Sequence, residues 1–109
     1  MANFDEKTIN LIWEKAMIDP NNDPNMFRKD YAGAWIRRDK YGDRSAKYGW
    51  EIDHVMPVSK GGTDAIENLL PLHWRNNDKK NDNYPRWETN MSSEGNQNVE
   101  KLKKWYVKQ

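Results

Sequence analysis

The absence of cysteine from a short, polar chain is the feature that most restricts how this chain can fold. It has 109 residues, no Cys and only 36% hydrophobic residues. Disulfides and thiolate-bound zinc, which stabilise many small domains, are therefore excluded. Six Trp and five Tyr offer large apolar surfaces instead, so an aromatic core is feasible. We expect a single domain over residues 1–109, and a metal ion or a partner would help to stabilise it.

The charged residues are unevenly distributed, although the formal net charge is only +1. Residues 1–27 hold two Lys against five acidic residues, residues 28–47 hold seven Lys or Arg against three Asp, and residues 98–108 hold four Lys against one Glu. Such asymmetry allows a basic face that attracts nucleic acid, and a solvated surface explains it equally well. Both explanations apply to Arg37, Arg38, Lys40, Arg44 and Lys47.

The N-terminal sequence and the hydropathy pattern bear on location. The first residues, MANFDEKTIN, lack the basic and long apolar regions of a signal peptide. No apolar run approaches the roughly 20 residues of a membrane span. We therefore expect a cytoplasmic protein without a membrane partner.

Hydrophobic periodicity predicts a helix, then short strands, in the first two thirds of the chain. Residues 5–18 place apolar side chains at helical spacing behind Asp5, a suitable N-cap. Residues 34–37 predict a short strand. Residues 48–53 alternate in the manner of a half-buried strand that Pro57 ends. The apolar run LLPLHW predicts a second strand of this pair, and RNNDKKND predicts a brief polar helix.

The C-terminal part predicts a flexible connection followed by a closing helix. The segment ETNMSSEGNQ, residues 88–97, is rich in polar and turn-forming residues. Val99, Leu102 and Tyr106 follow at helical spacing. Together the predicted elements give an α+β fold with helices at both ends.

Asp53 and His54 are the residues that first indicate chemistry. A carboxylate is a hard oxygen donor suited to Mg²⁺ or Mn²⁺, and a histidine can take a proton from water. Asn77 and Asn81 lie four residues apart on the short helix, hence on one face, and an amide oxygen is a tolerable ligand for a hard cation. Because adjacent strand residues point to opposite faces, such a site requires that Asp53 and His54 lie at a strand end or distortion, or that the scissile phosphate lies between their two directions.

The stretch EIDHVMPVSKGG followed by ENLLPLHWRNNDKKND resembles the HNH endonuclease family of ββα-metal nucleases. The family pattern is Asp or His before a His, then a Pro, a Gly-Gly loop, Asn-Leu, and a His or Asn nine residues after the first Asn. His54, Asn68 and Asn77 follow one another at separations of 14 and 9. The resemblance implies a ββα-metal core over about residues 48–83, with flanking N- and C-terminal helices.

The resemblance also implies a role for each matching residue. His54 would be the general base, and Asp53 and Asn77 would hold the metal. Asn68 would fix the loop that aims His54, and Gly61 and Gly62 would allow that loop to turn with positive φ or to approach other backbone closely. Lys80 matches a basic position common in the family and would contact a phosphate. Apart from the resemblance, Arg75 and Arg38 are further candidates for substrate contact.

Two departures from the family pattern affect the expected metal. The last motif position is Asn77 rather than His, which favours one Mg²⁺, with Mn²⁺ as a substitute, over Zn²⁺. Many relatives carry CxxC pairs that bind a structural zinc, whereas this chain has His73 and Asn76 where one pair would be expected. We therefore expect no structural zinc. His73 is expected to pack against Trp74 or to cap the short helix.

The implied function is metal-dependent hydrolysis of phosphodiester bonds in DNA. A single site cuts one strand at a time, so nicking is one expectation. No element that reads base edges is evident, so we also expect weak sequence preference, and a partner protein could supply specificity. The alternative is a nucleic-acid-binding module that keeps the fold without hydrolysis. The presence of Asp53, His54 and Asn77 together favours the enzyme.

Overall fold

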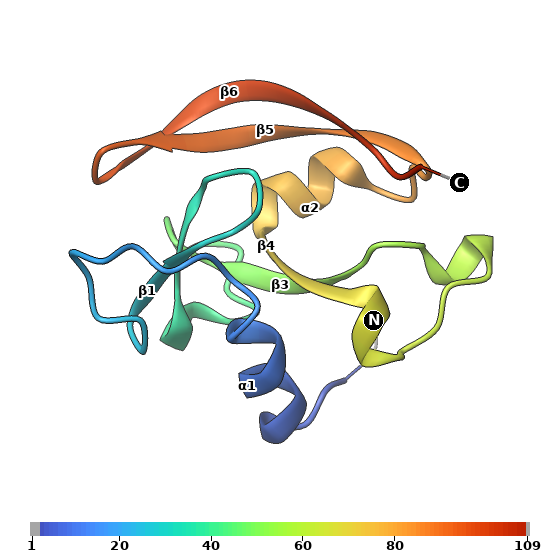
Figure 1. Ribbon diagram of the computed structural model, residues 1–109, viewed down its shortest axis with the longest axis horizontal. Coiled ribbons are helices and arrows are strands. Elements are labelled where there is room, and N and C mark those ends of the chain that lie inside the picture. The colour runs from blue at the N-terminus through green and yellow to red at the C-terminus, as the bar shows by residue number, and fades with distance from the viewer. Residues whose placement is uncertain (1–2, 109) are drawn as a thin grey trace.

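The computed structural model describes residues 3–108 as a mixture of short helices and small sheets, compatible with the expected α+β class. The helices are α1 (Glu6–Trp13) and α2 (Trp74–Lys80). Antiparallel pairs form between β1 (Phe27–Lys29) and β2 (Trp35–Arg37), β3 (Trp50–His54) and β4 (Leu69–His73), and β5 (Arg86–Glu94) and β6 (Gln97–Tyr106). Helix α2 lies between the β3–β4 pair and the β5–β6 hairpin, and α1 lies beyond β3–β4 (Figure 1).

Helix α1 begins where the sequence predicts and ends earlier. The Asp5 carboxylate accepts a hydrogen bond from the Thr8 N–H at 2.9 Å, which satisfies one of the free donors of the first turn. The helix ends at Trp13 instead of continuing to residue 18. The buried Arg28 side chain donates to the carbonyl oxygens of Glu14 and Ala16 at 3.1 and 3.3 Å. A residue distant in sequence therefore satisfies carbonyls that a longer helix would have used.

The main hydrophobic core packs α1 against the β3–β4 pair. Ile12, Trp50 and Leu69 are fully buried at its centre, and the Trp13 and Trp50 rings lie 5.3 Å apart. Each fully buried side chain of this size contributes about 1.5–3 kcal/mol. The predicted strands of residues 48–53 and 69–74 are confirmed as β3 and β4, and the predicted polar helix is confirmed as α2.

A buried pair, Asp30 and Asn76, joins three parts of the chain. One Asp30 oxygen accepts the N–H groups of Ala32 and Ala34, and the other accepts the His73 N–H and the Asn76 amide, all at 2.9–3.0 Å. Both side chains are fully buried. The turn after β1 and the start of α2 are therefore held by one carboxylate.

Asn76 continues this network into the C-terminal hairpin. Its amide oxygen accepts the N–H groups of Asn90 and Met91 at 3.0 and 2.8 Å, and its amide N–H also donates to the Met91 carbonyl at 3.0 Å. The register of β5 against β6 shifts at this point, between Thr89 and Met91. Irregular backbone that would otherwise be buried without partners is thus satisfied by one side chain.

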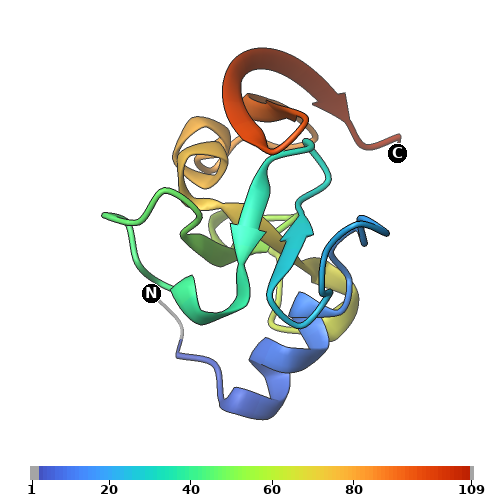
Figure 2. The same cartoon turned by 90° about the vertical axis from the view of Figure 1, so that its left-hand side faces the viewer.

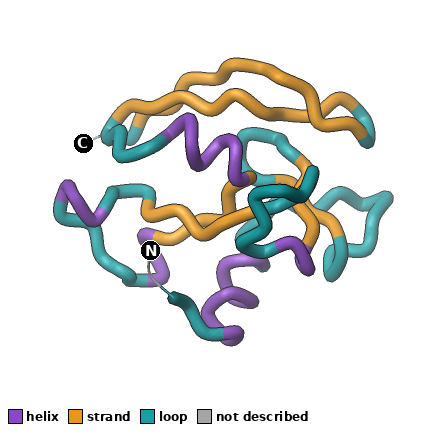
Figure 3. The backbone as a smooth tube through the Cα atoms, turned by 180° about the vertical axis from the view of Figure 1, so that it is seen from behind, coloured by secondary structure: helices purple, strands orange, loops and turns teal. Residues whose placement is uncertain are grey.

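The predicted flexible connection and closing helix are both wrong, because residues 86–106 form the β5–β6 hairpin. Leu102 and Tyr106, whose helical spacing suggested the helix, are 56% and 57% exposed. Lys103 and Trp105 are less exposed than their neighbours, which is the period of a strand. The hairpin runs along α2 on the side away from β3–β4 (Figure 3).

The hairpin is also attached to the turn between β1 and β2. The Lys103 ammonium donates to the Ala32 carbonyl at 2.9 Å, and the Ser93 hydroxyl donates to the Gly33 carbonyl at 2.6 Å. Figure 2 shows this turn reaching the hairpin. Within residues 3–108, no helix has the length and apolarity required to cross a membrane.

Replacing Asp30 by Asn should destabilise the fold strongly. The substitution exchanges one acceptor oxygen for an NH₂ group, so two of the four buried donors would face no acceptor. We expect the free energy of unfolding, measured by urea denaturation, to fall by roughly 3 kcal/mol or more. The control is Asp39→Asn, because Asp39 is exposed and its change should cost less than about 0.5 kcal/mol. Equal stability of the two variants would contradict the role given to Asp30.

Candidate active site

The end of β3 and one side of α2 enclose a hollow of about 730 Å³, which we call the β3–α2 hollow. Asp53 and His54 both line it, together with Asn77. Strand β3 ends at His54, so the alternation of side chains is not maintained beyond this residue, and both can face one space. Its other charged or amide-bearing lining residues are Arg44, Glu51, Asp64, Asp78, Asn81 and Asp82.

Asp53 is buried beside a buried lysine. Its side chain is 6% exposed, and one oxygen, Oδ1, lies 3.4 Å from the Lys80 ammonium nitrogen. Burial raises the pKa of Asp53 to about 6, while Lys80 and, to a lesser extent, His54 oppose this increase. The other oxygen, Oδ2, is buried and has no hydrogen-bond partner among the described residues. An unpaired carboxylate oxygen in such a place is costly, and a cation is the natural partner for it.

Asn77 presents a second oxygen to the same hollow. Its amide N–H donates to Glu51 Oε1 at 2.8 Å, which leaves the amide oxygen Oδ1 as the atom available to a cation. Within residues 3–108, no group of three or more His, Cys, Asp or Glu side chains is arranged to hold a metal by itself. One carboxylate oxygen and one amide oxygen nevertheless fit a hard cation that keeps most of its water. The residues present therefore suit the loose magnesium site expected from the sequence.

Glu51 and Arg44 also line the hollow, although neither belongs to the sequence pattern that predicted the site. Glu51 lies two residues before Asp53 on β3, so its side chain is on the same face. Arg44 donates two hydrogen bonds to the Glu51 carboxylate at 2.7 and 2.8 Å, and a third to Asp78 at 2.6 Å. Bidentate contacts of this kind fix both partners. Among the described residues, Arg44 is the only Lys or Arg that lines the hollow.

His54 is oriented by a carboxylate from the glycine-rich loop. Its Nε2 atom lies 2.7 Å from Asp64 Oδ1, and the imidazole is 18% exposed. Asp64 follows Gly61 and Gly62 closely in sequence, but nothing in its spacing identified it in advance. Asp64 lies ten residues after His54 in the loop that Asn68 was expected to fix, and this was the only signal in the sequence.

Asn68 and the two glycines determine the path of this loop. The Asn68 side chain accepts the Met56 N–H at 2.9 Å and donates to the carbonyls of Met56 and Thr63 at 3.0 and 2.9 Å. Gly61 has φ +94°, and a Cβ atom at Gly62 would lie only 1.7 Å from the Met56 carbonyl oxygen. One glycine meets the need for positive φ, and the other meets the need for close backbone approach.

The expectation that Lys80 contacts the substrate is wrong. Its side chain is fully buried, and its ammonium donates to the carbonyl oxygens of His54 and Val55, both at 3.1 Å. With Asp53 as a further neighbour, this cation is fully engaged inside the protein. Lys80 therefore holds the end of β3 and its carboxylate in place and has no access to a phosphate.

Arg38 and Arg75 lie outside the hollow. Arg38 pairs with Glu6 at 2.6 Å and also binds the Asn10 side chain, on the α1 side of the molecule. Arg75 is exposed, with its guanidinium carbon 5.3 Å from the Trp74 ring centroid. The structure therefore does not bring either arginine to the residues around Asp53. His73 caps α2 by accepting the Arg75 N–H at 3.1 Å and stacks on Trp74, and both of its expected structural roles are confirmed.

These features define a compact site of carboxylates, amides and one histidine beside a short helix. Residues 39–83, which contain nearly all of the site, match the family described as HNH endonuclease. This segment, which is less than half of the chain, is therefore similar to HNH endonuclease domains, whose family members are generally nucleases. The comparisons with curated proteins and with solved structures found no match.

Replacing Lys80 by Met should destabilise the protein and disturb the hollow. Removing the cation leaves the buried Asp53 and two carbonyl oxygens without their partner, and breaking such a pair costs about 3–5 kcal/mol. The measurement is urea denaturation, with Lys79→Met as the matched control, because Lys79 is 42% exposed. The control should change the free energy of unfolding by less than about 0.5 kcal/mol. Similar values for both variants would show that the buried cation is dispensable.

Proposed function

We propose that this chain is a metal-dependent endonuclease that hydrolyses phosphodiester bonds in DNA, and that residues 1–109 act as one nuclease domain around a ββα-metal core. The observation that carries the proposal is the buried, unpartnered Oδ2 of Asp53 in a hollow that also contains His54 and Asn77. The match of residues 39–83 to the HNH endonuclease family supports it.

Each residue of the hollow would have a separate role in hydrolysis. Asp53 Oδ2 and Asn77 Oδ1 would hold one divalent cation, Mg²⁺ or, as a substitute, Mn²⁺. When bound, this cation would stabilise negative charge on the phosphate and the leaving oxygen. His54 would take the proton from the attacking water. Arg44, held in place by Glu51 and Asp78, would present the remaining N–H groups of its guanidinium to the phosphate.

Asp64 would decide which nitrogen of His54 acts as the base. A carboxylate only accepts hydrogen bonds when ionised, so an ionised Asp64 at 2.7 Å would favour the imidazole proton on Nε2. Nδ1 then carries the free lone pair that can accept a proton from water. Asp64 is a positioning residue in this scheme, since it acts on the substrate only through His54.

The specificity expected of such an enzyme is low. Contacts to phosphates position a protein on DNA, whereas contacts to base edges read the sequence, and the hollow offers mainly carboxylates, which suit a metal ion and do not read bases. One hollow performs one cleavage at a time. We therefore propose nicking, or cleavage with weak sequence preference, unless a partner protein supplies specificity.

The first experiment is plasmid nicking in Mg²⁺, in Mn²⁺ and in EDTA, with His54→Ala purified in parallel. We expect metal-dependent conversion of supercoiled to nicked plasmid that is reduced at least 100-fold in the variant, since a general base contributes roughly 10²–10⁴-fold. Equal activity in both proteins would mean a contaminating nuclease or a wrongly assigned base. If both were inert but bound DNA, the non-catalytic binding module would replace the enzyme as the explanation.

The role of Asp64 can be tested by ¹⁵N NMR of the imidazoles, because the chain has only two histidines. His73 accepts at Nδ1 from Arg75 and contacts the Lys47 carbonyl through Nε2 at 2.9 Å, so it provides an internal reference for the Nε2–H form. We expect the ¹⁵N chemical shifts of His54 to show the same Nε2–H form. In Asp64→Ala this form should be lost, and activity should fall roughly ten- to hundredfold. Glu67→Ala, an exposed change in the same loop, should alter neither. An Nδ1–H pattern for His54 would contradict the assignment.

A further inference from the structure

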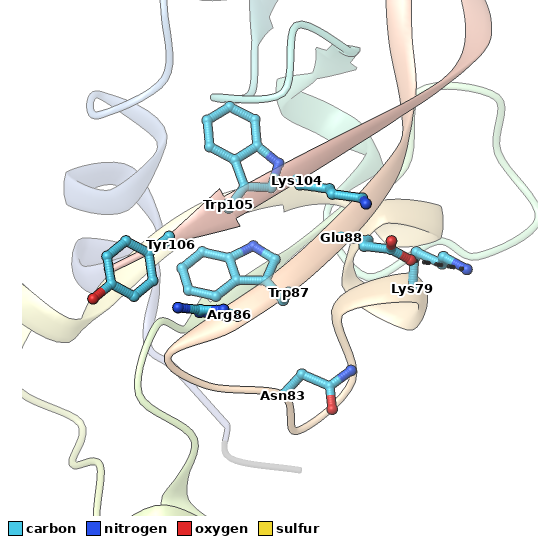
Figure 4. Close-up of a pocket in the computed structure, with 8 residues that line it drawn as sticks. All are labelled: Lys79, Asn83, Arg86, Trp87, Glu88, Lys104, Trp105 and Tyr106. Atoms are coloured by element: carbon cyan, nitrogen blue, oxygen red, sulfur yellow. Dashed lines mark ion pairs between the residues drawn. The ribbon is translucent and has the colours of Figure 1, made fainter. Parts of the chain in front are cut away.

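A second concave surface lies on the other side of α2, where the β5–β6 hairpin meets the end of that helix. It is an open groove of about 570 Å³, which we call the hairpin groove. Figure 4 shows Lys79 at the end of α2, with Arg86 and Glu88 projecting from β5 and Lys104 and Tyr106 from β6. None of these side chains belongs to the β3–α2 hollow, so the groove is a separate feature.

The groove carries an excess of positive charge. Three of its side chains are cationic, namely Lys79, Arg86 and Lys104, and one is anionic, Glu88. Glu88 pairs with Lys79 at 3.6 Å. Among the residues that the structure describes, neither Arg86 nor Lys104 forms an ion pair within 4.0 Å. Two cations are therefore available for an anionic ligand.

Aromatic rings form the remaining walls of the groove, and their polar atoms are engaged away from it. The Trp87 indole N–H donates to the Tyr31 hydroxyl at 3.0 Å, and the Trp105 indole N–H donates to the Thr89 hydroxyl at 2.8 Å. These bonds fix the orientation of both rings. Tyr106 is 57% exposed, and the Arg86 guanidinium lies 4.9 Å from its ring centroid.

Basic side chains interleaved with fixed aromatic rings are the chemistry that binds single-stranded nucleic acid. The cations contact the phosphates, and unpaired bases stack on the rings with little dependence on sequence. A duplex would not offer its base faces to Tyr106, and the carboxylates of an acidic peptide would pair with the cations but not with the ring surfaces. The combination of charge and exposed ring surface therefore favours one occupant, a single strand.

The groove is close enough to the β3–α2 hollow to hold the same molecule. Asn77 of α2 faces the hollow and Lys79 faces the groove, so the two surfaces are separated by the width of one helix, about 10–12 Å with side chains. An extended single strand covers more length per nucleotide than the ~3.4 Å axial rise of a duplex, so a few nucleotides span this width. Trp87 also covers Lys80, with the ammonium 5.0 Å from its ring centroid, so the groove wall contacts the cation that holds Asp53.

We propose that the hairpin groove binds a single-stranded segment of the nucleic acid whose phosphodiester is cleaved in the β3–α2 hollow, a few nucleotides from the cleaved bond. Arg86 and Lys104 contact its phosphates, and one base stacks on Tyr106. This inference rests on the proposed nuclease function for the identity of the ligand. The binding surface itself is separate from the catalytic residues.

The test is equilibrium binding of a short fluorescent single-stranded DNA by anisotropy, using full-length His54→Ala protein in EDTA so that no cleavage occurs. Arg86→Gln and Lys104→Gln should each make the dependence of log affinity on log salt less steep by about 0.7. Lys7→Gln is the matched control, because it removes one exposed positive charge from α1, remote from the hairpin (Figure 1). It should leave the salt dependence unchanged.

Replacement of Tyr106 separates stacking from charge. Tyr106→Ala should weaken binding at least about fivefold, and Tyr106→Phe should retain it, because the ring is what contacts the base. NMR provides a measurement that needs no groove variant. On addition of the DNA, the indole N–H signals of Trp87 and Trp105 should shift, and those of the core residues Trp13 and Trp50 should not.

The outcomes distinguish this proposal from the proposed function. Unchanged salt dependence in Arg86→Gln and Lys104→Gln, or DNA-induced shifts confined to other tryptophans, would overturn the groove even if plasmid nicking depends on metal and on His54. Binding that responds to all three groove residues would support the groove even if nicking failed. If a duplex and a single strand shifted the indole N–H signals of Trp87 and Trp105 equally, the proposed stacking of an unpaired base would be overturned.

Discussion

The arrangement of this chain depends on the buried contact between Asp30 and Asn76. The two side chains receive or donate hydrogen bonds to the turn after β1, the first residues of α2 and the bulged part of β5. Burial raises the pKa of Asp30 to about 6 even though four N–H groups favour its ionised form. In many relatives a zinc ion bound by cysteine pairs would hold this region, as the family resemblance implies. Here two polar side chains connect the segments, and the direction of α2 depends on them.

The position of α2 in turn determines the site. Lys80, one turn after Asn76 on this helix, reaches the carbonyl oxygens at the end of β3 and the Asp53 carboxylate. A buried ammonium is stable only when such partners surround it. Its contact with one oxygen of Asp53 leaves the other oxygen for the hollow. One Asp53 oxygen therefore contacts Lys80 and the other has no partner among the described residues. The proposed metal position thus follows from the packing of the buried Lys80 side chain.

The sequence was sufficient to predict secondary structure and site residues where the local pattern alone determines the structure. The alternation of residues 48–53 predicted β3, and the spacing of His54 and Asn77 indicated a site that β3 and α2 bring together. The sequence was insufficient where contacts with residues distant in the chain determine the secondary structure or the burial of a side chain. Helical spacing of Val99, Leu102 and Tyr106 was outweighed by pairing with β5 and by the contacts of Asn76, which no local pattern reveals. The burial of Lys80 was missed for the same reason, since its charge suggested a surface that tertiary packing covers.

The charges of the β3–α2 hollow explain why the proposed role with nucleic acid would require a cation. Glu51, Asp53, Asp64, Asp78 and Asp82 line it, whereas Arg44 is its one Lys or Arg among the described residues. Such a surface repels phosphate groups at neutral pH. Part of this negative charge is neutralised by the arginine, and a divalent cation at Asp53 would neutralise more. Attraction of the strand must then come from basic residues beyond the hollow, and the unpaired cations of the hairpin groove lie one helix width away. On this basis the hairpin, which the HNH match does not include, would supply attraction for nucleic acid that the acidic hollow lacks.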